Sequence, residues 1–223
     1  MAKNFADDQR EDYTSLVTGY HLSMEDRFFV DNLFYLLREK LGFDNCQPVS
    51  GFERRFKRFS KRLNLPFLRM KMTEWETKDM ISRILYYLRL DESYLNLVFQ
   101  KANIYQTGPA GHFVPTSVLG GTITIRLFKG FDFPIYFAVA IHECMHYYFH
   151  CHEIYFNNAQ EEEWCADMAA VYFGFGRYLL KGYQEYTQAD KYFFEGRRTI
   201  RVGYLTIPEL AYAENNYAIG MGK

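Results

Sequence analysis

Hydrophobic residues recur at helical spacing along most of the chain, and a capping residue precedes nearly every such segment. Apolar positions at i, i+3 and i+4 mark one face of a helix, and Ser, Thr or Asn with an acid three residues later marks its start. The pattern predicts helices at 24–41, 52–63, 74–90 and 133–150, at 159 to 174 or 182, at 188–197 and from 207 onward.

Polar and apolar residues alternate in shorter stretches, which is the period of a β-strand. This alternation predicts strands at 67–72, 93–100, 121–127 and 199–205. The stretch 121–127 (GTITIRL) is the most regular and the richest in β-branched residues. Many helices and few strands indicate an α+β, helix-rich fold in which a small sheet precedes the helix at 133–150.

The strongest loop signal in the chain is the stretch TGPAG at 107–111. It divides the chain into a helical N-terminal region, 1–110, and a C-terminal region, 111–223, and the two can share one core. A chain of 223 residues accommodates one large domain or two small ones.

The composition is that of a globular protein, with 48% hydrophobic and 24% charged residues, which excludes disorder for most of the chain. A net charge of -1 gives no general attraction to nucleic acid, which we do not expect as a partner. The helix at 53–62 is locally basic and carries Phe residues on one face. It could contact a phosphate backbone or an acidic lipid surface, or be the solvated face of an ordinary amphipathic helix.

The chain has four cysteines and no C-x-x-C pair, so we expect reduced, mostly buried thiols. Its first residues are polar and lack the apolar run of a signal peptide. The longest apolar run, Ile135–Ile141, is too short to span a bilayer. These features predict a cytoplasmic protein without a membrane span.

The chemistry of the chain concentrates in the sequence His142-Glu143-Cys144-Met145-His146, which fits H-E-x-x-H. On a helix, residues four apart point the same way, so His142 and His146 can share one Zn²⁺. Glu143 lies beside them and can take a proton from a water bound to the metal. The helix is otherwise apolar, and a metal would compensate the burial of these polar groups.

Two candidates could supply a third metal ligand. His152 lies six residues after His146, but that spacing requires a glycine at the position of Phe149 for the chain to turn back. Glu163 follows on the next predicted helix, with Asp167 one turn later. One of these acids could ligate zinc while the other accepts the free ring N–H of a ligating histidine. The neighbouring Glu161 and Glu162 are interpreted as favourable charge at a helix N-terminus.

His142-Glu143-x-x-His146 followed by Glu163-x-x-Ala166-Asp167 resembles the gluzincin clan of zinc metallopeptidases, over about residues 119–175. The resemblance implies His142, His146 and Glu163 as zinc ligands, Glu143 as the general base and Asp167 as a carboxylate that orients a ligating histidine. It also implies a zincin-like fold for 111–223 and a peptide or protein as substrate. In such enzymes the strand before the active-site helix lies at the sheet edge, which makes 121–127 the expected substrate-binding strand.

We therefore predict a zinc-dependent peptidase in which Glu143 activates a zinc-bound water. His112, His150, Tyr155 and Tyr204 are candidates for stabilising the oxyanion. Two alternatives remain: a zinc-binding domain without peptidase activity, either inactive or serving an interaction, and a zinc hydrolase that acts on a non-peptide bond.

Overall fold

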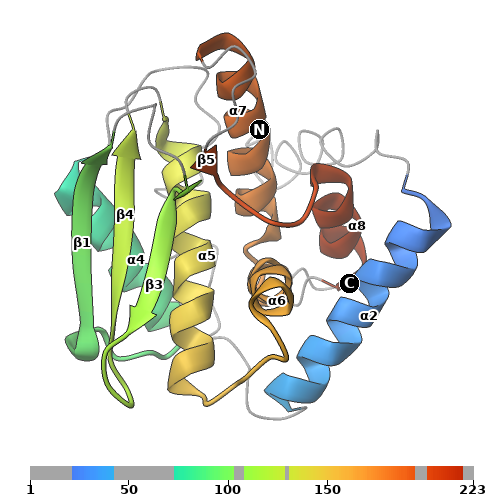
Figure 1. Cartoon of the computed structure of the whole chain (residues 1–223), viewed down its shortest axis with the longest axis horizontal. Helices are drawn as coiled ribbons and strands as arrows, with labels where there is room; N and C mark the ends of the chain where they lie inside the picture. Colours follow the sequence, from blue (N-terminus) through green and yellow to red (C-terminus); the bar gives the residue numbers. More distant parts are fainter. Residues whose placement is uncertain (1–21, 43–72, 103–107, 129–130, 194–199, 218–223) are drawn as a thin grey trace, which may run out of the picture.

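A mixed sheet of three strands in the order β1-β4-β3 forms one side of the molecule (Figure 1). The strands are β1 (Leu95–Ala102), β3 (Gly111–Pro115) and β4 (Gly121–Phe128), and a short 3-10 helix at Glu92–Tyr94 leads into β1. The computed structural model of the protein describes residues 22–42, 73–102, 108–128, 131–193 and 200–217. The predicted α+β class is confirmed, whereas the predicted helix at 52–63 and strand at 67–72 lie outside the described residues.

Strand β4 lies in the centre of the sheet, so the prediction that 121–127 forms its edge is wrong. On one side β4 pairs with β1 in parallel, and on the other it pairs with β3 in antiparallel register. The side chains of Ile123 and Ile125 are fully buried, as a central strand requires. Strand β3 takes an edge instead, where Pro115 is tolerated because an edge strand can lack one N–H donor.

The helices cover one face of the sheet and then extend away from it (Figure 1). Helices α4 (Glu74–Tyr87) and α5 (Phe133–Cys151) lie next to the sheet. Beyond them are α6 (Ala159–Tyr172), α7 (Gly176–Phe193), α8 (Ile207–Tyr217) and α2 (Met24–Leu41), and β2 (Gly108–Pro109) pairs in parallel with β5 (Ile200–Arg201). Residues on both sides of position 110 contribute to the sheet and to one hydrophobic core.

Helix α5 is the centre of the structure. It contacts α4, α6, α7, β3 and β4, and every residue from Ile135 to Phe149 is buried. A helix enclosed in this way can be apolar on all sides, which explains its hydrophobic sequence. In the described part of the chain, neither α5 nor any other helix combines the length and the apolar character needed to cross a membrane.

Most of the predicted helix starts are confirmed by their hydrogen bonds. Ser23, Thr73 and Asn158 accept bonds from the backbone at the starts of α2, α4 and α6, and Thr206 and Glu209 form the reciprocal pair at α8. Helix α5 differs, because Asp132 makes no side-chain cap bond there. Its start relies on Pro134, whose fixed φ suits the first helical turn.

Three helices end in the same hydrogen-bonding motif, in which one residue adopts a left-handed conformation. That residue is Arg89 after α4 (φ 59°), Glu153 after α5 (φ 53°) and Gly174 after α6 (φ 84°). In each case its N–H and the next N–H bond back to carbonyls of the last turn, which is a Schellman motif. Only Gly174 adopts this conformation without steric cost.

The C-terminal third of the chain differs most from the prediction. The helix predicted from 159 ends at Tyr172, close to the first of its two predicted ends, at 174. Helix α7, however, begins at Gly176 and continues to Phe193, instead of starting near 188. The strand predicted at 199–205 is only Ile200–Arg201. The N–H groups of Tyr204 and Leu205 donate to the carboxylate of Asp167 and so do not join a neighbouring strand.

The left-handed residues predict opposite effects of two substitutions. Arg89→Gly should raise the free energy of unfolding by about 1 kcal/mol, because an exposed non-glycine residue pays that much for a left-handed conformation. Gly174→Ala should lower it by about the same amount for the same reason. Urea denaturation of both variants checks this, and shifts of the same sign would contradict it.

Candidate metal centre

Two imidazoles and one carboxylate lie close together at the wall of a cavity of about 450 Å³. His142 and His146 lie one turn apart on α5 and project in the same direction. Oε2 of Glu163, on α6, lies 2.9 Å from Nε2 of His142 and 3.1 Å from Nε2 of His146, and these two nitrogens are 3.1 Å apart. Tetrahedral zinc ligands at about 2.0–2.1 Å lie roughly 3.3 Å from one another, so the spacing of these donors suits zinc.

Asp167 contacts Nδ1 of His142, the ring nitrogen that does not face Glu163. Its Oδ1 lies 2.8 Å from Nδ1 of His142 and accepts a second bond from the hydroxyl of Tyr183 at 2.6 Å. Its Oδ2 accepts from the N–H groups of Tyr204 and Leu205 at 2.9 and 2.8 Å. The carboxylate is fully buried, so it fixes the ring of His142 with Nε2 directed toward the other donors.

Glu162 makes the corresponding bond to His146 from a more exposed side chain (42%), and the sequence interpretation missed this contact. Its Oε1 lies 2.9 Å from Nδ1 of His146, whereas the sequence suggested only favourable charge at the start of α6. Glu161 does have such a local role, since it contacts Asn157 and Asn158. One signal could have identified Glu162: each ligating histidine needs a partner for its second nitrogen, and Asp167 can serve only one.

Glu143 lies between the candidate metal donors and strand β3. Its side chain is buried, and burial raises the pKa of its carboxyl group above the usual value. The backbone of Gly111 packs directly against it, because a Cβ atom at that position would lie only 2.8 Å from Oε1 of Glu143. Glycine at 111 therefore lets the start of β3 approach the carboxylate closely.

The candidate donors have strongly shifted pKa values, because imidazoles and carboxylates lie close together in a buried place. Burial lowers the pKa of both imidazoles, but hydrogen bonds to Asp167 and Glu163 raise the pKa of His142 well above its usual range. Bonds to Glu162 and Glu163 likewise raise the pKa of His146 to about 9. Burial also acts to raise the pKa of Glu163, yet bonds from both imidazoles hold it well below its usual range. Protons on the rings thus compensate the surrounding carboxylates, and a divalent cation could do the same.

His152 does not join this group. Helix α5 continues two residues past Phe149 and the chain turns at Glu153, so the ring of His152 packs against Tyr148 at a tilt of 35°, with 4.2 Å between ring centroids. The three donors that the structure brings together are those of His142, His146 and Glu163. That they bind zinc stays a prediction.

The four candidates for oxyanion stabilisation all line the cavity; they are His112, His150, Tyr155 and Tyr204. The ring of Tyr204 stacks on His142, with centroids 5.5 Å apart and an interplanar angle of 15°. Nε2 of His150 lies 2.7 Å from the carbonyl oxygen of Ser117 and is engaged there. Tyr155 is 71% exposed at the rim. This arrangement favours Tyr204, which lies next to His142, a candidate metal donor.

Comparisons of the chain with models of protein families, with curated proteins and with solved structures find no match. The resemblance to gluzincins therefore depends on the residues of the site themselves. Those residues are His142, Glu143 and His146 on α5 and Glu163 and Asp167 on α6.

A series of variants tests the predicted metal site. We expect about one zinc ion per chain. Glu163→Ala should lose zinc affinity severely, because it removes a proposed ligand. Asp167→Ala and Glu162→Ala should lower zinc affinity about 10- to 100-fold, because Asp167 and Glu162 orient the two histidines. Glu161→Ala is the matched control for Glu162→Ala, and His152→Ala should also keep its affinity. Competition titration with a chromophoric chelator measures these values. Unchanged affinity in Glu163→Ala would exclude Glu163 as a ligand.

The raised pKa of His146 predicts how stability depends on pH. A pKa of about 9 in the folded protein, against about 6.5 when unfolded, means that folding tightens proton binding. This contribution to stability is complete below pH about 6.5 and is lost as the pH rises through about 9. The melting temperature of metal-free protein should fall over this range. Zinc should reduce the fall by replacing the proton, and an equal fall with and without zinc would contradict the prediction.

Proposed function

We propose that the protein is a zinc-dependent peptidase that hydrolyses bonds in peptide or protein substrates. The observation that carries the proposal is the convergence of His142, His146 and Glu163 beside the buried carboxylate of Glu143, at the wall of a cavity. Structural zinc sites usually have four protein ligands, whereas catalytic sites have three and keep one position open. Three donors at a cavity match the catalytic arrangement.

A zinc ion held by these donors would supply Lewis acidity, which polarises a carbonyl group and makes water more acidic. Glu143 is the residue proposed to move the proton. Its carboxylate takes a proton from the attacking water, whose oxygen bonds to the carbonyl carbon. It then passes this proton to the nitrogen as the C–N bond breaks, which leaves a carboxylic acid and an amine.

Strand β3 is proposed to position the substrate. Within the described residues β3 pairs on one side only, with β4, and its residues His112, Phe113 and Pro115 line the cavity. An extended peptide can add to such an edge through backbone hydrogen bonds. Because Gly111 packs against Glu143, a peptide paired with β3 would pass directly beside the proposed base.

Two other functions could use the same donors. A zinc hydrolase acting on a non-peptide bond shares the chemistry, and a zinc domain without peptidase activity shares the metal. The buried Glu143 disfavours a purely structural site, and the edge of β3 that is unpaired among the described residues favours an extended peptide as substrate. Incubation of zinc-loaded protein with a complex peptide mixture separates them, because only a peptidase creates new amino termini detectable by mass spectrometry.

The proposed role of Glu143 predicts that Glu143→Gln keeps zinc and loses hydrolysis. The amide preserves shape but cannot accept a proton, and general-base catalysis contributes about 10²- to 10⁴-fold. Glu161→Gln makes the same chemical change outside the site and should keep full activity. Peptide turnover and zinc content are measured on both variants, and full activity of Glu143→Gln would refute this mechanism.

A further inference from the structure

The lining of the cavity includes apolar residues that the proposed chemistry does not use. Five of them define what we call the apolar pocket: Phe113 and Pro115 of β3, Phe149 of α5, and Ile154 and Phe156 of the segment after α5. We infer that it binds a large apolar side chain of the substrate, carried by a residue on the amino-terminal side of the scissile bond. The inference rests on the proposed peptidase function and adds the class of substrate to it.

The apolar pocket is built before any substrate arrives. The Schellman motif at the end of α5 fixes the backbone of 153–154 through bonds to the carbonyls of His150 and Phe149, at 3.2 and 2.9 Å. It requires Glu153 to adopt φ 53°, which a non-glycine residue does at a steric cost. The turn brings Phe156 against Phe149, with ring centroids 4.9 Å apart. Preformed walls reduce the entropy lost on binding.

The distance between the apolar pocket and the candidate metal donors suits a substrate residue close to the scissile bond. Phe149 follows His146 by about one helical turn, and their ring centroids are 6.5 Å apart. An extended peptide advances roughly 3.3 Å per residue. A side chain in the pocket therefore belongs to a residue within about two positions of the carbonyl at the donors.

The direction of β3 indicates on which side of the scissile bond this residue lies. Gly111, at the start of β3, packs against Glu143, whereas Phe113, two residues later, lies 5.7 Å from Tyr147 and 5.6 Å from His150 between ring centroids. A peptide antiparallel to β3, the slightly more stable pairing, runs from the Phe113 end toward Gly111. It passes the apolar pocket before it reaches Glu143, so the pocket receives a residue that precedes the scissile bond.

The five residues that define the apolar pocket carry no charge. The carboxylates that line the cavity, those of Glu143, Glu162 and Glu163, lie at the candidate metal centre, and the imidazoles of the lining outside that centre are those of His112 and His150. Burying a Phe, Leu or Met side chain is worth about 1.5–3 kcal/mol, whereas an unpaired charge placed there would lose its hydration. Tyr155 stands at the rim with 71% of its surface exposed and could cover such a side chain.

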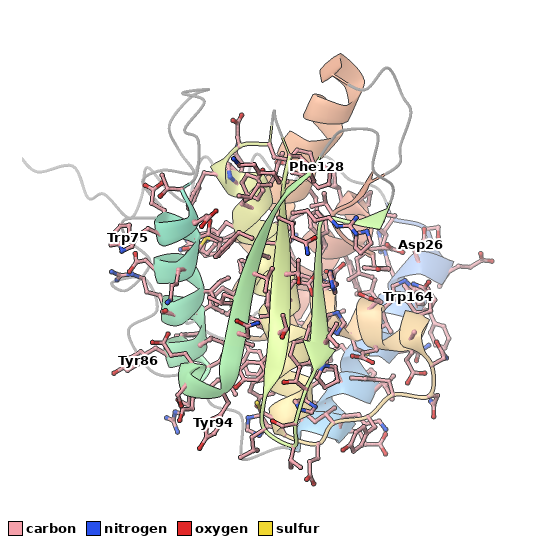
Figure 2. All side chains as sticks on the ribbon, turned by 60° about the vertical axis from the view of Figure 1, so that its left-hand side comes forward. Asp26, Trp75, Tyr86, Tyr94, Phe128 and Trp164 are labelled. Atoms are coloured by element: carbon pink, nitrogen blue, oxygen red, sulfur yellow. The ribbon has the colours of Figure 1, made fainter. Side chains whose placement is uncertain are left out.

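A binding experiment tests the pocket without relying on turnover. Capped peptides of Gly, Ser and Thr with one central Phe are compared with peptides that carry Ala there, using zinc-loaded Glu143→Gln protein and calorimetry. We expect about 10- to 100-fold tighter binding of the Phe peptides and a smaller preference in Tyr155→Ala and Phe156→Ala. Tyr86→Ala is the matched control for Tyr155→Ala, because Tyr86 is 59% exposed and points outward from α4 (Figure 2). Equal binding of the two peptide sets, or none, overturns the proposal.

Cleavage of a peptide library by the unmodified protein tests the direction. Phe, Tyr, Leu or Met should be enriched within two positions before the cleaved bond, and enrichment only after the bond would overturn the proposal. The two proposals fail separately. Selective binding of Phe peptides without any cleavage would reject the peptidase and keep the pocket, whereas cleavage without side-chain preference would reject the pocket and keep the peptidase.

Discussion

A helix that is buried on every side must satisfy each of its polar groups through its neighbours, and α5 is such a helix. It places His142, Glu143 and His146 within a run of buried residues. An unsatisfied buried polar group costs about 1–3 kcal/mol, so three of them would strongly destabilise the domain. The arrangement of α6 provides most of the compensation, because its acidic residues face the imidazoles of α5. The position of one helix thus follows from the polarity of the other.

Asp167 extends this compensation to the C-terminal part of the chain. Its two oxygens accept four hydrogen bonds, from His142, Tyr183, Tyr204 and Leu205. These donors belong to α5, to α7 and to the segment before α8. The same carboxylate therefore orients a candidate metal ligand and joins three parts of the fold. Stability and the geometry of the site depend on one group.

The features that sequence reasoning predicted correctly are local ones. Helix α2 has the predicted bounds, and the caps at Thr73 and Asn158 form as expected, because a cap depends on residues a few positions apart. The side-by-side placement of His142 and His146 likewise follows from helical geometry alone. To predict that Glu163 and Asp167 lie close to these histidines, the resemblance to a known metal-site pattern was needed as well.

The features that were missed depend on contacts between distant segments. Whether β4 is central or at an edge is decided by its partners β1 and β3, which the alternation within β4 does not encode. The sequence around Glu162 indicates only favourable charge at a helix N-terminus, because its contact with His146 depends on how α6 packs against α5. The segment at 202–205 has the composition of a strand, but the N–H groups of Tyr204 and Leu205 donate to the buried carboxylate of Asp167 and not to a neighbouring strand.

The bonds between Asp167 and the backbone at 204–205 have a consequence for a chain made from its N-terminus onward. Tyr204 and Leu205 follow Asp167 by 37 and 38 positions, so the ribosome must add them before the carboxylate acquires its full set of donors. During that interval the residues of α5 and α6 that carry the candidate ligands are already part of the chain, but two of the four donors to Asp167 are still missing. If the site binds a metal, its full affinity would therefore be reached only after residues 204–205 have been added.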